Sequence, residues 1–177
     1  MVILRAAILI INGGVFLKFS KVYILAGGNL GDRKKILFEA EEQLRSAAEV
    51  VAVSSFYKSE AWGMDNSPEF INQAWCVHTG LQPWEFLALL QQIESQYPRE
   101  RNPHQYLNRY LDLDILYWNQ EVIDLPELKV PHPKVYERHF ALLPLCEIAP
   151  QLRDPATGCA VKQHLQQCRD NGKVVKL

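Results

Sequence analysis

The sequence lacks the marks of several large protein classes. Its 177 residues include only four cysteines, which form no C-x-x-C pair and no zinc-ligand spacing. This argues against a zinc module and favours the reduced thiols of a cytoplasmic protein. The net charge is only −1, so the composition predicts no general affinity for nucleic acid.

Phosphate-binding glycine motifs are also missing. Neither G-x-x-x-x-G-K-[ST] nor G-x-G-x-x-G occurs, so any use of ATP must proceed without a P-loop. The nearest stretch is GGNLGD at residues 27–32. It could cradle a phosphate, but we favour a tight turn from a strand into a helix that Asn29 or Asp32 caps.

No hydrophobic run is long enough to cross a membrane. The uncharged run at 6–17 falls short of the roughly 20 residues that a bilayer requires. It loosely resembles a signal peptide, yet Gly13 and Gly14 interrupt it and no convincing cleavage site follows. We expect residues 1–20 to be an extension, either an added strand or the product of an upstream start codon. Residues 21–177 then form one domain with no membrane segment.

What is present indicates a globular α+β domain, because 48% of the residues are apolar and 22% are charged. Apolar periodicity predicts strands at 21–27, 49–57, 70–79 and 111–118 and helices at about 33–48 and from Pro83. This order predicts a ferredoxin-like α/β sandwich, a mostly antiparallel sheet with helices packed on it. Smaller elements are expected at 121–123, 160–168 and 173–176.

The strand at 111–118 has an unusual pattern, LDLDILYW. Alternation places Leu111, Leu113 and Ile115 on one face and both Asp112 and Asp114 on the other, with the aspartate Cα atoms about 7 Å apart. Two carboxylates on one face repel each other unless a cation lies between them. The pattern therefore indicates either an ordinary half-exposed edge strand or a site for Mg²⁺ with a phosphate-bearing substrate.

Polar and aromatic residues around this strand favour the second interpretation without deciding it. Arginines and histidines lie on both sides of it, a mixture that a nucleotide–Mg²⁺ site needs, although each arginine alone could be a solvated surface charge. His132 lies between two prolines, which suits a ligand contact and equally a turn. Phe70 and Asn72 share a strand face, where a ring and an amide could bind a flat heterocycle.

Six segments, taken in order, resemble 6-hydroxymethyl-7,8-dihydropterin pyrophosphokinase of folate biosynthesis. They are LAGGNLGDR, VSSFYKSEAWG, EFINQAW, RYLDLDILYW, VPHP and ERHFALLPLCEIAP, and the resemblance covers residues 21–155. It implies that the pterin hydroxymethyl oxygen attacks the β-phosphorus of ATP and that AMP leaves. It also implies two Mg²⁺ ions on Asp112 and Asp114. The proton acceptor stays open between a carboxylate and a water on the metal.

The same matching assigns roles to individual residues. The expected catalytic groups are Arg99, Arg109, Asp112 and Asp114. The expected pterin pocket comprises Ser59, Trp62, Phe70, Asn72, Tyr106 and Phe140. The expected ATP contacts are Gln91, Glu94, Arg99, Arg101, Arg109, Ile115, His132 and Arg138. The partners are small molecules only, and nothing in the sequence demands more than a monomer.

Two departures from the family pattern stand out. Tyr106-Leu107-Asn108 precedes Arg109 where Trp-Gly-Pro is common, so loop closure could differ. Gly28 stands where serine is usual, which we expect to be a mild change. The first departure supports an alternative, a catalytically degenerate pterin- or nucleotide-binding protein. A further alternative, a metal-dependent phosphohydrolase, would not need Phe70, Asn72 and Phe140.

Overall fold

A six-stranded antiparallel sheet forms the centre of the molecule. The computed structural model describes residues 7–11, 14–64, 66–98 and 108–177. The main strand order is β10-β5-β6-β3-β7, and β4 also pairs with β6. The strands are β3 (Ser20–Gly28), β4 (Glu49–Val53), β5 (Tyr57–Ser59), β6 (Phe70–Thr79), β7 (Asp112–Trp118) and β10 (Val174–Lys176).

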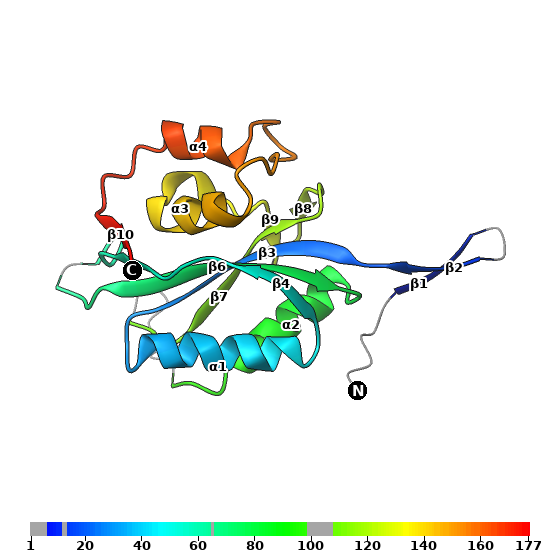
Figure 1. Cartoon of the computed structure of the whole chain (residues 1–177), viewed down its shortest axis with the longest axis horizontal. Helices are drawn as coiled ribbons and strands as arrows, with labels where there is room; N and C mark the ends of the chain where they lie inside the picture. Colours follow the sequence, from blue (N-terminus) through cyan, green and yellow to red (C-terminus); the bar gives the residue numbers. More distant parts are fainter. Residues whose placement is uncertain (1–6, 12–13, 65, 99–107) are drawn as a thin grey trace.

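Helices cover both faces of this sheet (Figure 1). One face carries α1 (Arg33–Arg45) and α2 (Pro83–Glu94), and the other carries α3 (His139–Ile148) and α4 (Val161–Gln167). A short 3-10 helix, η1 (Val135–Glu137), precedes α3. Two apolar clusters result, one on each side of the sheet. The predicted ferredoxin-like order of strands and helices is confirmed, and α3 and α4 add a third layer.

The first helix follows the predicted pattern. Ile36, Leu37, Ala40 and Leu44 are its buried residues, which is the spacing of one helical face. Asp32 caps the helix, because its side chain accepts the Lys35 N–H at 3.2 Å. The alternative in which Asn29 is the cap is therefore wrong.

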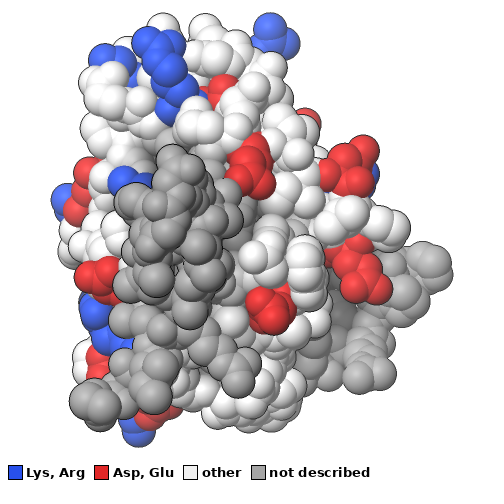
Figure 2. Space-filling view, turned by 90° about the vertical axis from the view of Figure 1, so that its right-hand side faces the viewer, with Lys and Arg blue, Asp and Glu red and all other residues white. Residues whose placement is uncertain are grey.

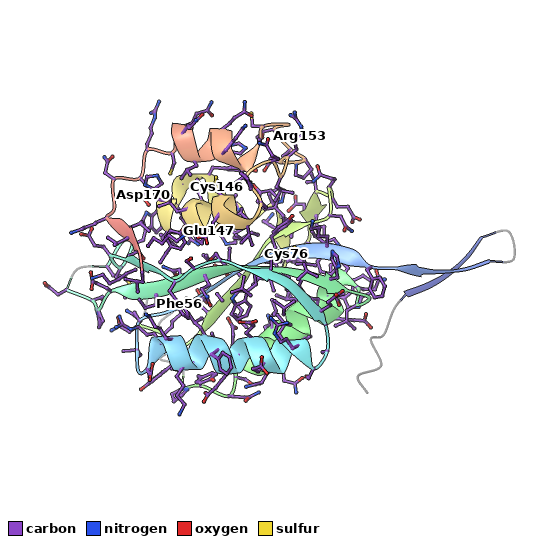
Figure 3. The ribbon with its side chains drawn as sticks, viewed as in Figure 1. Phe56, Cys76, Cys146, Glu147, Arg153 and Asp170 are labelled. Atoms are coloured by element: carbon purple, nitrogen blue, oxygen red, sulfur yellow. The ribbon has the colours of Figure 1, made fainter. Side chains whose placement is uncertain are left out.

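The strand predicted at 49–57 is two strands, β4 and β5. Between them, the Ser54 hydroxyl accepts the Ala74 N–H at 3.0 Å, and the register against β6 shifts. Glu147 of α3 reaches this break, where it accepts hydrogen bonds from the Ser55 and Tyr57 hydroxyls at 2.9 and 2.6 Å. It lies between α3 and the sheet (Figure 3). A serine pair inside an apolar run can thus end one strand and start another.

Two small antiparallel sheets lie outside the main one. β8 (Ile123–Asp124) pairs with β9 (Lys129–Val130), so the strand expected at 121–123 begins and ends later. β1 (Ala7–Ile11) pairs with β2 (Gly14–Lys18) and not with the main sheet. This hairpin projects from the body in Figure 1. Of the two alternatives for residues 1–20, an added strand is not what the described residues form, because β1 and β2 make a separate hairpin.

Surface and membrane features are modest. On the face shown in Figure 2, acidic and basic side chains are dispersed among neutral ones, with no continuous basic surface among the residues that are described there. Within the described part of the chain, no helix has the length and apolar character needed to cross a bilayer. All four cysteines are free thiols, and Cys76 is buried in the sheet (Figure 3).

Candidate active site

A cavity of about 190 Å³ opens at the end of the sheet where β3, β6 and β7 run side by side. Aromatic and amide groups line one part of it, and charged groups line the other. The lining residues are Leu25, Gly27, Ser59, Glu60, Trp62, Met64, Phe70, Asn72, Arg109, Asp112, Asp114, His132, Arg138 and Phe140. Side chains from six separate segments therefore meet at one place.

Two further cavities adjoin the first one. One of about 650 Å³ includes Gln91 and Glu94, and one of about 300 Å³ includes Ile115 and His132. Asp112 lines the first and second cavities, and Asp114 lines all three. The carboxylates thus stand between a compartment with aromatic walls and a more polar one.

The alternation predicted for β7 places these carboxylates. Leu111, Leu113 and Ile115 are buried in the cluster under α1 and α2. Asp112 and Asp114 point to the opposite face, where their side chains are 28% and 32% exposed. The leucine face anchors the strand by burial, so the carboxylates are held on a rigid support.

Cationic groups surround both carboxylates. The Arg109 guanidinium forms an ion pair with Asp112. An Arg138 guanidinium nitrogen lies 3.6 Å from an Asp114 oxygen. These contacts offset the repulsion between two carboxylates on one strand face. They also place two arginines where phosphate oxygens could reach them.

His132 is a neutral group at this site. Burial is the main cause that lowers the pKa of His132 to about 4, and the charge of Arg138 adds to it. Its Nδ1 accepts the Lys134 N–H at 3.1 Å, so the proton of the neutral ring is on Nε2. Nε2 lies 3.9 Å from an Asp114 oxygen. His132 can therefore donate a hydrogen bond into the cavity, and its contact with Asp114 is not an ion pair.

Among the described residues of the site, Arg138 is the most enclosed cation, with 12% of its side chain exposed. Its guanidinium carbon lies 5.2 Å from the centre of the Trp62 ring and 5.6 Å from that of Phe140. Its Nε is buried and has no hydrogen-bond partner in the described part of the chain. A buried donor of this kind is costly unless an acceptor binds it, and an anionic ligand could supply that acceptor.

Asn72 is a buried amide on the wall of the aromatic compartment. It is 2% exposed, and its Nδ2 donates to the Ser59 hydroxyl at 3.0 Å. Gly27 lies opposite Asn72 in the β3–β6 pairing. A Cβ atom on Gly27 would come within 2.3 Å of the Asn72 Oδ1. Glycine at position 27 therefore makes room for the amide.

The structure brings together all the predicted site residues that it describes. Arg99, Arg101 and Tyr106 lie outside the described residues, so their roles stay predictions. Glu94 lines the second cavity and also accepts the Leu113 N–H at 2.7 Å, a contact with β7 that sequence reasoning missed. In the first cavity, the wall residues that sequence reasoning missed are Leu25, Gly27 and Met64.

Gly28 packs closely against the backbone of a second segment, and whether glycine in place of serine is a mild change stays a prediction. A Cβ atom there would lie 2.2 Å from the Tyr110 carbonyl oxygen and 2.9 Å from its carbon. Both atoms belong to the backbone, so a serine at this position requires the two segments to move apart. The only sequence signal for this was the repeated glycine of GGNLGD.

The donor set suits a metal that is shared with a substrate. The described residues contain no group of three or more His, Cys, Asp or Glu side chains that could hold an ion. Mg²⁺ is commonly bound by one or two carboxylates together with substrate phosphates and water. Asp112 and Asp114 fit that pattern, with arginines close enough to bind the same phosphates.

Comparisons with known proteins agree on one family. Residues 23–150 match the family model described as 7,8-dihydro-6-hydroxymethylpterin-pyrophosphokinase. A 2-amino-4-hydroxy-6-hydroxymethyldihydropteridine pyrophosphokinase of Bacillus subtilis is 41% identical over 143 residues, which is 80% of this chain and 85% of that protein. The protein of the same name from Aquifex aeolicus is 37% identical over 134 residues, 76% of this chain and 83% of that protein.

Solved structures show the same fold. A Plasmodium falciparum HPPK-DHPS triple mutant with SDX-DHP aligns with a TM-score of 0.66 at 15% identity. The alignment covers 85% of this chain and 44% of that longer one, so this chain spans less than half of its length.

Proposed function

The chain belongs to the 7,8-dihydro-6-hydroxymethylpterin-pyrophosphokinase family, and we propose that Asp112 and Asp114 hold two Mg²⁺ ions at its active site. The enzyme transfers pyrophosphate from ATP to the hydroxymethyl group of 6-hydroxymethyl-7,8-dihydropterin, giving AMP and the pterin diphosphate in folate biosynthesis. ATP is therefore a co-substrate. The number of metal ions and the roles of individual residues are proposed.

The observation that carries this assignment is the position of the two carboxylates. They line both the aromatic compartment and the polar one. A pyrophosphoryl group must pass from a nucleotide to a pterin, so the groups that manage its charge must lie between the two substrates. Bound Mg²⁺ would neutralise the triphosphate and favour attack at the β-phosphorus.

The aromatic compartment is the proposed pterin site. Phe70 and Phe140 enter it from β6 and α3 and supply ring faces, with Trp62 beside them. Asn72, held by Ser59, supplies the amide that binds the polar edge of the heterocycle. Tyr106 is proposed to complete this pocket.

The polar compartment, together with the charged part of the first cavity, is the proposed ATP site. Arg138 lines the first cavity, and its buried Nε has no acceptor among the described residues, so a phosphate oxygen would supply one. Arg109 lines the first and second cavities and neutral His132 lines the first and third, so both supply further donors beside the carboxylates. Gln91, Glu94 and Ile115 lie farther along, on the proposed nucleoside side. Arg99 and Arg101 are proposed to contact phosphates, and the enzyme is proposed to work as a cytoplasmic monomer.

The direct test is AMP production from ATP with saturating Mg²⁺, with and without 6-hydroxymethyl-7,8-dihydropterin. Wild type should form AMP only when the pterin is present. Asp114→Ala should abolish this, whereas Asp124→Ala should not, because Asp124 lines none of the three cavities. Equal loss in both variants would remove the proposed metal role from Asp114.

The alternatives predict different outcomes of the same assay. A catalytically degenerate binding protein would bind the pterin, detected by fluorescence quenching, without forming AMP. A metal-dependent phosphohydrolase would hydrolyse ATP whether or not the pterin is present. Pterin-dependent AMP from the wild type would exclude both alternatives.

A further inference from the structure

Asn29 is a buried amide that lines none of the three cavities, yet it is bonded to a segment that does. It is 3% exposed. Its Oδ1 accepts the Arg109 N–H at 2.7 Å, and its Nδ2 donates to the Asn108 Oδ1 at 2.7 Å and to the Pro68 carbonyl at 3.2 Å. Capping of α1 does not require it, because Asp32 performs that task.

The backbone at Asn29 and Leu30 also forms hydrogen bonds with Arg109. The N–H groups of Asn29 and Leu30 both donate to the Arg109 carbonyl oxygen, at 2.8 and 3.1 Å. Both backbone polar groups of Arg109 are therefore bonded to this one short segment. Fixing them fixes the direction in which the Arg109 side chain leaves the backbone, toward Asp112 and the cavities.

Two further residues, Asn108 and Gly28, tighten the contact. Asn108 offers a side-chain acceptor to Asn29, which a proline at that position could not do. Gly28 allows the Tyr110 carbonyl oxygen to come so close that a Cβ atom would lie 2.2 Å from it. The two departures from the family pattern thus meet at one junction, between residues 28–29 and 108–110.

We propose that Asn29, supported by Asn108 and Gly28, is a positioning residue that aims Arg109 during pyrophosphoryl transfer. Asn29 does not contact the substrates and acts only through Arg109. The proposal rests on the function proposed above. Its physical reason is that misplacing a charge-stabilising group by about 1 Å can cost about 100-fold in rate.

The test is a double-mutant cycle of Asn29→Ala and Arg109→Ala. Single-turnover rates of AMP formation are measured together with calorimetric Kd values for the pterin and for Mg²⁺ with α,β-methylene-ATP. Asn29→Ala should slow transfer about 10- to 100-fold with the pterin Kd changed less than about twofold. In the Arg109→Ala background the same change should cost less than about threefold, because the two residues act as one unit.

Control variants separate positioning from general destabilisation. Gln73→Ala also removes a buried amide, one bonded to Ser54 and Trp75 and outside all three cavities. It should lower the melting temperature and keep the rate within about threefold of wild type. If Asn29→Ala does not fold, Asn108→Ala replaces it in the cycle, because Asn108 is only half-buried.

Several results would overturn the proposal. One is a double variant whose rate loss equals the product of the losses in Asn29→Ala and Arg109→Ala, which would mean that the two residues act independently. Another is a loss of pterin affinity in Asn29→Ala as large as its loss of rate. If wild type forms no pterin-dependent AMP, the proposed function fails by itself. The same double-mutant cycle is then evaluated with the Kd for Mg²⁺ and α,β-methylene-ATP. Coupled effects of the two substitutions on this Kd would support the positioning role, and independent effects would reject it.

Discussion

Replacing Gly27 by alanine should damage pterin binding selectively. Gly27 faces Asn72 on one side and Asp112 on the other in the register of the sheet. An added Cβ would lie 2.3 Å from the Asn72 Oδ1, whereas an ordinary contact between carbon and oxygen is about 3.3 Å. The amide therefore has to move by about 1 Å.

The size of the effect follows from what that movement breaks. Asn72 is 2% exposed and donates to Ser59 at 3.0 Å, so it has little room to turn without losing this bond. A neutral hydrogen bond contributes about 1 kcal/mol, and the displaced amide loses one or two of them. A loss of about 1 to 2 kcal/mol corresponds to a roughly 5- to 30-fold weaker pterin Kd.

The assay is calorimetric titration with the pterin and, separately, with Mg²⁺ and α,β-methylene-ATP. Nucleotide affinity should change less than about threefold, because the Cβ would point at Asn72 and not at the carboxylates. Gly172→Ala is the matched control, since the three atoms nearest to its Cβ would all belong to the side chain of Asp170, outside the three cavities. A folded Gly27→Ala protein that binds pterin as wild type does would refute the assignment of Asn72 to the pterin.

Three further outcomes are expected. Gly28→Ala should slow single-turnover AMP formation about tenfold with an unchanged pterin Kd, because its Cβ displaces the backbone beside Arg109; an unchanged rate would contradict the close junction. Asp154→Ala should lower the free energy of unfolding in urea by about 3 kcal/mol or more, because it removes the carboxylate that accepts hydrogen bonds from the Tyr117 and Tyr136 hydroxyls and from two backbone N–H groups; a loss below about 1 kcal/mol would count against this network. Burial opposes ionisation of Asp154, but hydrogen bonds from Tyr136, Thr157, Ala156 and Tyr117 outweigh it and hold the pKa of Asp154 below 3.8. This stability is present above that value and is lost as the pH falls through the folded-state pKa. The free energy of unfolding, measured in urea at each pH, should therefore fall more steeply between pH 5 and pH 2 in wild type than in Asp154→Asn.

Much of the fold could be predicted because its local and global signals agree. The helix that begins at Arg33 has apolar residues at helical spacing, and β7 has strict alternation up to Ile115. In each element the apolar residues lie on one face, and that face is buried, so tertiary packing agrees with the local pattern. The division of 49–57 into two strands could not be predicted in this way. It depends on the Ser54 hydroxyl, which accepts the Ala74 N–H of the paired strand β6, and that contact is not visible in the local sequence.

The site could be predicted only where side-chain chemistry was visible in the sequence. A carboxylate pair and an amide beside an aromatic ring are such signals, and the predicted residues that are described line shared cavities. Asn29 and Gly27 gave no such signal, because their importance comes from partners about 40 to 80 residues away. A turn between a strand and a helix is enough to explain the residue types of GGNLGD. Only the three-dimensional contacts show that this segment also packs against Asn72 and the backbone of Arg109.

The position of the carboxylate pair results from a change in burial along one face of β7. Asp112, Asp114 and Leu116 alternate onto the same face, yet Leu116 is buried in the cluster beneath α3. The first two are partly exposed, so the covered part of this face ends between Asp114 and Leu116. Beyond Ile115 the pairing with β3 slips, and Tyr117 also enters the α3 cluster. The strand therefore buries both faces at one end and presents charges at the other, and burial at the first end holds the charges still at the second.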